Sequence, residues 1–178
     1  MSTITVKDKI FSPFITADVL DKAVSKIAAA MESDLKGKDP LFLVVLNGAF
    51  VFASDLMKKL HFPCEISFIK LSSYSGLQTS NKVRELIGLN EDISGRTVVV
   101  LEDIIDTGVT LGELLEIVKS KNAADVKLAA LLFKPNAFRK DYKIDYLGLE
   151  IPNDFIVGYG LDYDGFGRNY PDIYKIVE

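Results

Sequence analysis

The sequence TVVVLEDIIDTGVTL, at residues 97–111, decides the fold that we expect. Its apolar run at 98–101 is typical of a strand that is buried on both faces of a parallel sheet. Two adjacent carboxylates, Glu102 and Asp103, follow at the strand end, and a third, Asp106, precedes a Thr-Gly step and a helix. Three acids at the mouth of a buried strand, beside a loop of small residues, indicate a ligand site.

Apolar runs alternate with helical patterns on both sides of this stretch. Strands are expected at 41–46, 64–71, 98–101 and 126–133, and helices at 17–36, 48–60 and 110–120. Thr16 can cap the first helix, and Gly37 can end it. Because strands that alternate with helices form right-handed βαβ crossovers, we expect an α/β fold with a mostly parallel central sheet and flanking helices.

Two of these helices have a face that we assign to the core. In the first helix, apolar residues recur every four positions, at Val19, Ala23, Ile27, Met31 and Leu35. In the second, the residues expected to point inward are Phe50, Val51, Ala53, Ser54 and Met57. An apolar stripe of this kind normally packs against a sheet.

The remaining segments do not fit the alternation. We interpret 72–82 as a mobile loop, with a short strand at 83–89 after it. The C-terminal part has short apolar pieces broken by prolines and glycines, which favours a small hood over the carboxyl edge of the sheet, where ligands of open α/β folds bind. The expected organisation is a single domain, 1–178, with a core at about 16–133 and a hood at about 1–15 and 134–178.

Composition excludes several function classes. The net charge of −4 argues against a nucleic-acid surface, and no apolar run approaches the ~20 residues of a membrane span. Cys64 is the only cysteine, which is consistent with a reducing cytoplasm. His61 is the only histidine and is expected in a solvent-exposed turn, so a Ser-His-Asp mechanism is close to excluded.

The loop at 106–110 has the chemistry of a phosphate cradle. Backbone N–H groups at the start of a helix bind a phosphate monoester without basic side chains, and Thr107 and Thr110 can add hydroxyl donors. Glu102 and Asp103 can accept hydrogen bonds from vicinal hydroxyls and hold Mg²⁺ through its water shell. A ribose 5-phosphate meets both demands, although a capped helix with a solvated acidic turn is the alternative. The loop is not a Walker A motif.

The stretch VVVLEDIIDTGVTL, at 98–111, resembles the 5-phosphoribosyl 1-pyrophosphate (PRPP) binding motif of type I phosphoribosyltransferases. The third acid, in EDIIDTG, resembles the hypoxanthine-guanine branch, and the similarity extends from about residue 41 to 174. The resemblance implies purine salvage with Mg²⁺: transfer from PRPP to N9 of hypoxanthine or guanine, giving IMP or GMP and pyrophosphate. The exposed βα loops and the apolar helix at 48–60 are compatible with a homodimer or homotetramer, although the sequence does not decide the oligomeric state.

The resemblance also assigns the site residues. Those for ribose phosphate are Glu102, Asp103, Asp106, Thr107, Gly108, Val109 and Thr110. Those for pyrophosphate are Asn47, Gly48, Arg168, and Ser73 and Tyr74 of a lid. Those for the purine are Ile105, Lys134, Phe155, Ile156 and Asp162. Those for Mg²⁺ are Glu102, Asp103 and Asp162.

Four of these residues have more specific expected roles. Asp106 would accept or hold the proton at purine N7, and Lys134 would donate to the 6-oxo group. Phe155 would stack on the base. Asn47 stands where the family commonly has lysine, so backbone groups would carry the pyrophosphate contact. Relatives often have a non-proline cis peptide in this loop, and the sequence leaves open whether the loop at 46–48 contains one.

Three rival functions are weighed against this one. A PRPP-sensing regulator would need a basic face, which the acidic charge disfavours. A non-catalytic nucleotide-binding domain would leave Arg168 and the lid without purpose. A transferase for xanthine or adenine is the third, but the 6-amino group of adenine mismatches the donor Lys134.

Overall fold

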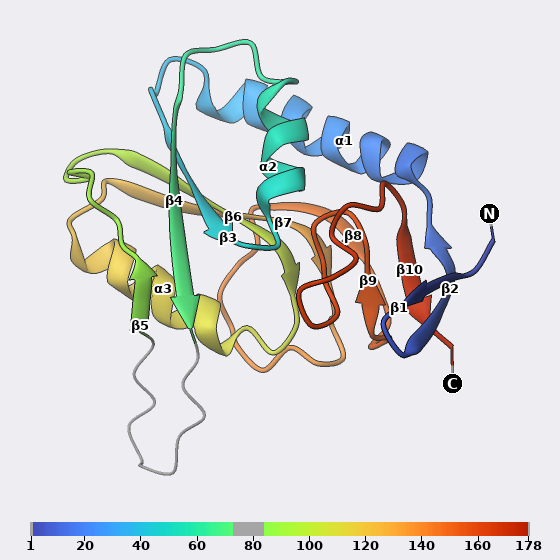
Figure 1. Ribbon diagram of the computed structural model, residues 1–178. Helices are drawn as coiled ribbons and strands as arrows, with labels where there is room; N and C mark the ends of the chain where they lie inside the picture. The colour runs from blue at the N-terminus through green and yellow to red at the C-terminus, as the bar shows by residue number, and fades with distance from the viewer. Residues whose placement is uncertain (1, 73–83, 178) are drawn as a thin grey trace.

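The computed structural model describes residues 2–72 and 84–177, and these residues form two sheets (Figure 1). The larger sheet has the strand order β5-β4-β3-β6-β7-β8. Its five strands from β4 to β8 in that order are parallel, and β5 pairs antiparallel with β4. The strands are β3 (Leu41–Leu46), β4 (Glu65–Ser72), β5 (Arg84–Ile87), β6 (Thr97–Ile105), β7 (Asp125–Phe133) and β8 (Tyr146–Glu150).

Helices cover both faces of this sheet, which confirms the predicted fold class. Figure 1 shows α1 and α2 on one side and α3 on the other, and the core is divided in the same way. The helices are α1 (Ala17–Leu35), α2 (Phe50–Met57) and α3 (Val109–Ser120). The Thr16 hydroxyl accepts the Val19 N–H at 3.3 Å, as expected of a cap, and Gly37 follows α1 with a φ of +80°.

The central strand β6 explains where the site opens. Its residues 98–101 are fully buried and alternate between the two halves of the core. The strand is longer than predicted, because it pairs with β7 as far as Ile105. Its pairing with β3 ends at Leu101. Glu102 and Asp103 therefore lie inside the strand, at the level where its neighbour β3 no longer covers it.

The hood is a second, antiparallel sheet in the order β1-β2-β10-β9. Both ends of the chain enter it, as Figure 1 shows. Its strands are β1 (Ile4–Val6), β2 (Lys9–Ile15), β9 (Ile156–Val157) and β10 (Ile173–Ile176), around a small core of Val6, Phe11, Val157 and Tyr174. The expected start of the hood at residue 134 is too early, because β8 still belongs to the larger sheet.

The helix faces differ from the predicted ones in detail. Val19 is 42% exposed, and the neighbouring Leu20 is fully buried in its place. In α2 the buried residues are Phe52, Ala53 and Leu56, whereas Phe50 and Ser54 are exposed. The helix begins two residues later than expected, at Phe50, because the chain first turns through the loop at 47–49.

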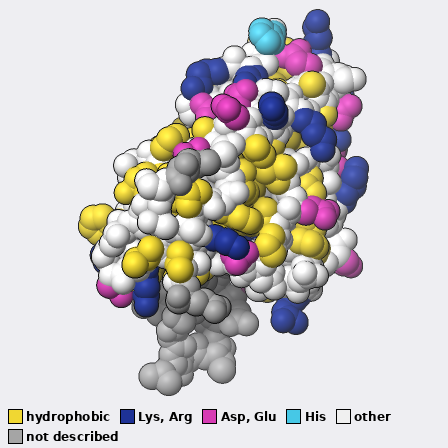
Figure 2. All heavy atoms as spheres, turned by 90° about the vertical axis from the view of Figure 1, so that its right-hand side faces the viewer, with side chains coloured by type: hydrophobic (Ala, Val, Ile, Leu, Met, Phe, Trp, Pro, Cys, Tyr) yellow, Lys and Arg dark blue, Asp and Glu magenta, His cyan; other side chains and the backbone are white. Residues whose placement is uncertain are grey.

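The surface carries charges of both signs. Figure 2 shows Lys and Arg side chains interspersed with Asp and Glu around hydrophobic side chains on the face that includes the hood. The His61 side chain is 80% exposed, as predicted for a turn residue. Within residues 2–72 and 84–177, no helix is long and apolar enough to cross a membrane.

Candidate functional site

The predicted phosphate cradle lines a cavity. The loop at 106–110 joins β6 to α3, and Gly108 stands at the helix start with a φ of +76°, which glycine adopts without strain. The cavity has a volume of about 230 Å³, and its walls include Glu102 and the loop residues Asp106, Thr107, Gly108, Val109 and Thr110. These predicted ribose-phosphate residues therefore share one cavity at the N-terminus of a helix.

The same loop is held from behind by a segment that sequence reasoning missed. The Arg139 N–H donates to the Thr107 carbonyl at 3.2 Å. The Tyr142 hydroxyl donates to the Gly108 carbonyl at 3.0 Å. No local signal marks these two residues in the sequence, because they follow the loop by about thirty positions and carry no motif.

Asp103 is buried and Glu102 is half-buried in the cavity wall, and each affects the other. Burial raises the pKa of Glu102 well above its usual range, and the neighbouring Asp103 charge raises it further. Burial also raises the pKa of Asp103, which is 6% exposed, while the Arg168 charge opposes that rise. The Asp103 Oδ1 atom accepts the Ile104 N–H at 2.9 Å. A ligand that supplies hydrogen-bond donors or a cation would stabilise the ionised form of this pair.

The Asp103 carboxylate packs directly against the loop that follows β3. A Cβ built on Gly48 would lie 1.7 Å from Asp103 Oδ2, so only glycine leaves room for this carboxylate. The cis peptide of this loop joins Leu46 and Asn47. The sequence left open whether this loop contains a cis peptide, and the structure places one immediately before Asn47. Gly48 is the loop residue that lies against the buried Asp103.

Hood residues meet this loop and complete a corner, which we call the pyrophosphate corner: residues 46–48, Asp103, Gly160, Asp162 and Arg168. A Cβ on Gly160 would lie 2.1 Å from the Gly48 carbonyl oxygen, so the two backbones are in contact. Arg168 Nη1 donates to the Gly160 carbonyl at 2.6 Å, and Nη2 pairs with Asp162 Oδ1 at 2.6 Å. The other predicted pyrophosphate residues, Ser73 and Tyr74, lie outside the described residues.

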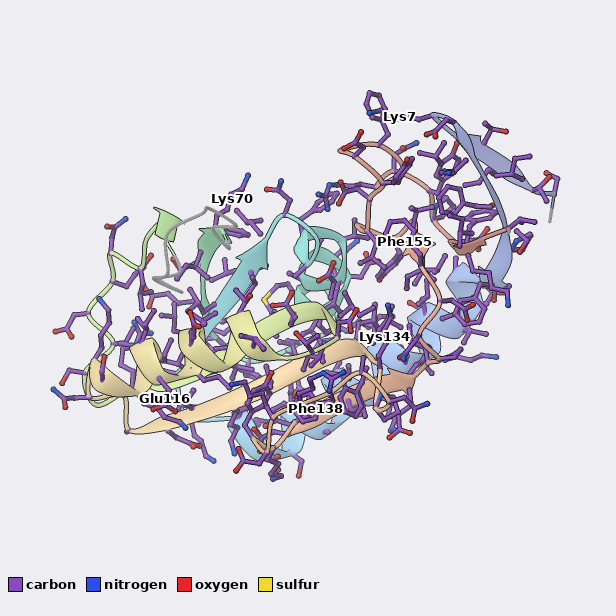
Figure 3. The ribbon with its side chains drawn as sticks, turned by 90° about the horizontal axis from the view of Figure 1, so that it is seen from below. Lys7, Lys70, Glu116, Lys134, Phe138 and Phe155 are labelled. Carbon is purple, nitrogen blue, oxygen red and sulfur yellow. The ribbon has the colours of Figure 1, made fainter. Side chains whose placement is uncertain are left out.

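Two of the predicted purine residues, Lys134 and Phe155, present groups that a base could contact. Lys134 is 8% exposed, and its Nζ pairs with Asp106 Oδ2 at 3.3 Å. Figure 3 shows Lys134 between Phe138 and Phe155. Phe155 is 46% exposed and meets Tyr163 edge-to-face, with 5.9 Å between ring centroids. The open face of its ring is consistent with stacking on a base.

Two further purine assignments fall on buried residues. Ile105 is 1% exposed and packs in the core beneath α3, although it also lines the 230 Å³ cavity. Ile156 is buried in β9, where it pairs with Lys175 of β10. Any contact that either residue makes with a base would therefore come from backbone groups.

The carboxylates fit a magnesium ion that arrives with its substrate. Among the residues that the structure describes, no group of three or more His, Cys, Asp or Glu side chains could hold a metal ion. Glu102 and Asp103 form a pair, and Asp162 stands with Arg168. Mg²⁺ is commonly bound by one or two carboxylates together with waters and substrate phosphates, and this donor set matches that habit.

Comparison with known proteins places these features in a family. The profile of the phosphoribosyl transferase domain matches residues 16–164. The chain is 36% identical over 169 residues to the hypoxanthine-guanine phosphoribosyltransferase of Bacillus subtilis, and the match covers 94% of both. It is 39% identical over 160 residues to the bifunctional protein TilS/HprT of Listeria monocytogenes, of which it spans 25%.

Solved structures agree with this assignment. A hypoxanthine phosphoribosyltransferase from Staphylococcus aureus superposes with a TM-score of 0.88 at 32% identity, over 93% of this chain and 91% of that one. The enzyme from Trypanosoma cruzi, in complex with the product IMP, also gives 0.88 at 32% identity, over 98% and 97%. The chain therefore belongs to the phosphoribosyltransferase family, within its hypoxanthine-guanine branch.

Proposed function

We propose that the protein transfers the 5-phosphoribosyl group of PRPP to N9 of hypoxanthine or guanine, giving IMP or GMP and pyrophosphate. The observation that carries this proposal is the ion pair between Lys134 and Asp106, beside the loop at 106–110. In this proposal the pair supplies a donor for a 6-oxo group and an acceptor for a ring N–H, and Asp106 also lines the cavity of the loop. The names of the relatives support the same activity.

The base is read by two groups of opposite type. The carboxylate of Asp106, whose side chain is 54% exposed, accepts the proton at purine N7 and so raises the nucleophilicity of N9. The ammonium group of Lys134 donates to the 6-oxo group. Adenine would present an amino donor to this ammonium, and two donors that face each other without an acceptor are unfavourable. Phe155 stacks on the ring.

The donor sugar is bound along the edge of the sheet. Its 5′-phosphate is held by backbone N–H groups of the loop at 106–110 together with the Thr107 and Thr110 hydroxyls. Its 2′- and 3′-hydroxyls donate to Glu102 and Asp103. This arrangement leaves C1 of the ribose between the purine and the pyrophosphate corner, so N9 attacks from the face opposite the leaving group.

The pyrophosphate corner stabilises the leaving group. Arg168 offers forked donors, and Asn47 and Gly48 offer backbone groups, while Ser73 and Tyr74 would cover the site and exclude water. Glu102, Asp103 and Asp162 are the residues that would hold Mg²⁺. When bound, the ion supplies positive charge to the departing pyrophosphate.

The proposal extends to the compartment and the assembly of the enzyme. We place it in the cytoplasm as a single domain that acts without nucleic acid or membrane, because its one thiol, Cys64, is free and its net charge is −4. A homodimer or homotetramer is proposed because α2 exposes Phe50.

A panel of bases tests the proposed function. Purified protein with PRPP and Mg²⁺ is expected to convert hypoxanthine or guanine to the nucleotide, and adenine at least tenfold more slowly. Asp106→Asn is expected to lower kcat by roughly 10²–10⁴-fold, because general-base help has that size, with only a small change in PRPP affinity. Preference for adenine, or full turnover by the variant, would contradict the assignment of the base site.

A further inference from the structure

A short aromatic segment outside the cavity lining contacts the phosphate loop. The Tyr142 hydroxyl donates to the Gly108 carbonyl at 3.0 Å, and this carbonyl also accepts the Gly112 N–H at 2.9 Å within α3. The Gly108 carbonyl therefore accepts two hydrogen bonds, one from the Tyr142 side chain and one from the helix backbone. Tyr142 has no role in the proposed reaction as described above.

Aromatic rings fill the space beneath the first turn of α3. Tyr142 meets Phe138 edge-to-face with 5.2 Å between ring centroids, and Phe138 meets Phe133 in the same way at 5.2 Å. A Cβ on Gly108 would lie 2.5 Å from the Tyr142 hydroxyl oxygen and 2.6 Å from the Phe138 ring. The loop therefore rests on a packed aromatic floor, part of which is Phe138 in Figure 3.

The hydrogen bonds of this floor fix the direction of the loop amides. In a trans peptide the carbonyl and the following N–H point in opposite directions. The Thr107 and Gly108 carbonyls are bound from behind, so the N–H groups of Gly108 and Val109 point to the other side. We infer that Tyr142, which binds the Gly108 carbonyl, is a positioning residue that aims the Val109 N–H group at the 5′-phosphate.

The environment of Tyr142 suits a permanent donor. Burial and the nearby Glu102 charge raise the pKa of Tyr142 to about 12, so the hydroxyl keeps its proton throughout the neutral range. The inference rests on the proposed function, because the 5′-phosphate is the ligand that the loop is proposed to bind.

Binding of IMP and of inosine, measured by calorimetry, separates the phosphate from the rest of the nucleotide. Tyr142→Phe keeps the ring and removes only the hydroxyl. It is expected to weaken IMP binding roughly two- to tenfold, the size of one neutral hydrogen bond, and to leave inosine binding unchanged. In turnover, KM for PRPP should rise while KM for hypoxanthine stays constant.

Tyr146→Phe is the matched control. It also removes a partly buried tyrosine hydroxyl, one that donates to Asp34 at 3.2 Å on the α1 side of the sheet. The ratio of IMP to inosine affinity should stay at the wild-type value. If Tyr142→Phe does not fold, Phe138→Leu, which loosens the floor and keeps the hydroxyl, is expected to show the same phosphate-selective loss.

The outcomes distinguish a failure of the proposed function from a failure of the positioning role of Tyr142. A wild-type protein that binds inosine as tightly as IMP would contradict the phosphate loop itself, and with it the proposed function. A wild-type protein that prefers IMP, combined with a Tyr142→Phe variant that keeps the full preference, would overturn the positioning role alone. Equal weakening of both ligands would also overturn it, because that result describes general damage to the fold.

Discussion

The phosphate loop at 106–110 and the pyrophosphate corner bind anions by different physical means. The loop offers backbone donors at the start of a helix and is supported from behind by hydrogen bonds to its carbonyls. The corner relies on charged side chains, with Arg168 between Asp162 and the buried Asp103. The loop therefore depends on the direction of its amides, and the corner depends on volume and charge.

The largest expected effect tests the tight volume of the corner. Gly48→Ala would place a Cβ 1.7 Å from Asp103 Oδ2, far inside the van der Waals contact distance of the two atoms. Relief of an overlap with a buried neighbour costs about 1–3 kcal/mol or more, so kcat/KM for PRPP should fall by roughly 100-fold. Steady-state kinetics at saturating hypoxanthine measure this quantity.

Gly112→Ala is the control for that substitution. Gly112 lies in α3 beside the loop, and its added Cβ would meet Tyr142 at an ordinary 3.4 Å. This variant should keep near-wild-type kcat/KM and gain slight stability from helix propensity. Equal losses in the two variants would mean that the corner is no less tolerant of volume than the floor of the loop.

A smaller effect tests the charge of the corner. Arg168→Gln removes a forked cation that donates to Gly160 and pairs with Asp162. KM for PRPP should rise roughly ten- to hundredfold, the size of one or two hydrogen bonds to a charged group. IMP carries no pyrophosphate, so its affinity, measured by calorimetry, should stay within about threefold. A matching loss of IMP affinity would place Arg168 at the phosphate loop instead.

The smallest effect concerns Glu102, which lines the cavity of the loop and is next in sequence to Asp103 of the corner. Because burial raises the pKa of Glu102, ionisation of this group opposes folding, and the protein loses stability as the pH rises through the unfolded-state pKa toward the folded one. Glu102→Gln should therefore raise Tm by a few degrees at pH 7 and by less at pH 4, while PRPP binding weakens. Differential scanning calorimetry at both pH values measures this.

Glu116→Gln controls for the loss of a negative charge. The Glu116 side chain is 76% exposed on α3, where it pairs with Lys119. Its Tm should change little and equally at the two pH values, since exposed pairs contribute little. A Glu102→Gln variant that loses stability at pH 7 would show that the free protein needs the ionised carboxylate.

The sequence predicted the parts of the fold that depend on local pattern. The apolar run at 98–101 required burial on both faces, and the structure confirms it. The buried faces of α1 and α2 were less predictable, because apolar residues such as Val19 and Phe50 occur on both sides of each helix. Strand β8 belongs to the larger sheet because it pairs with β7. No pattern within residues 146–150 predicts that pairing.

The candidate site divides in the same way. The motif residues Glu102 and Asp106 to Thr110 could be predicted together because they are adjacent in sequence, and they line one cavity. The contact between Gly48 and Gly160 could not, because two backbones meet there across the chain. The roles of all these residues in binding and catalysis stay predictions that the experiments above address.

The pairing of β2 with β10 has a consequence for how the protein is made. The hood sheet joins Lys9–Ile15 to Ile173–Ile176, so its first long strand must wait for nearly the whole chain to leave the ribosome. The strands of the larger sheet are synthesised earlier and have local partners to meet. A nascent chain would thus complete the proposed sugar-phosphate site before the hood that is proposed to bind the purine. Deletion of β10 should therefore weaken purine binding more than sugar-phosphate binding.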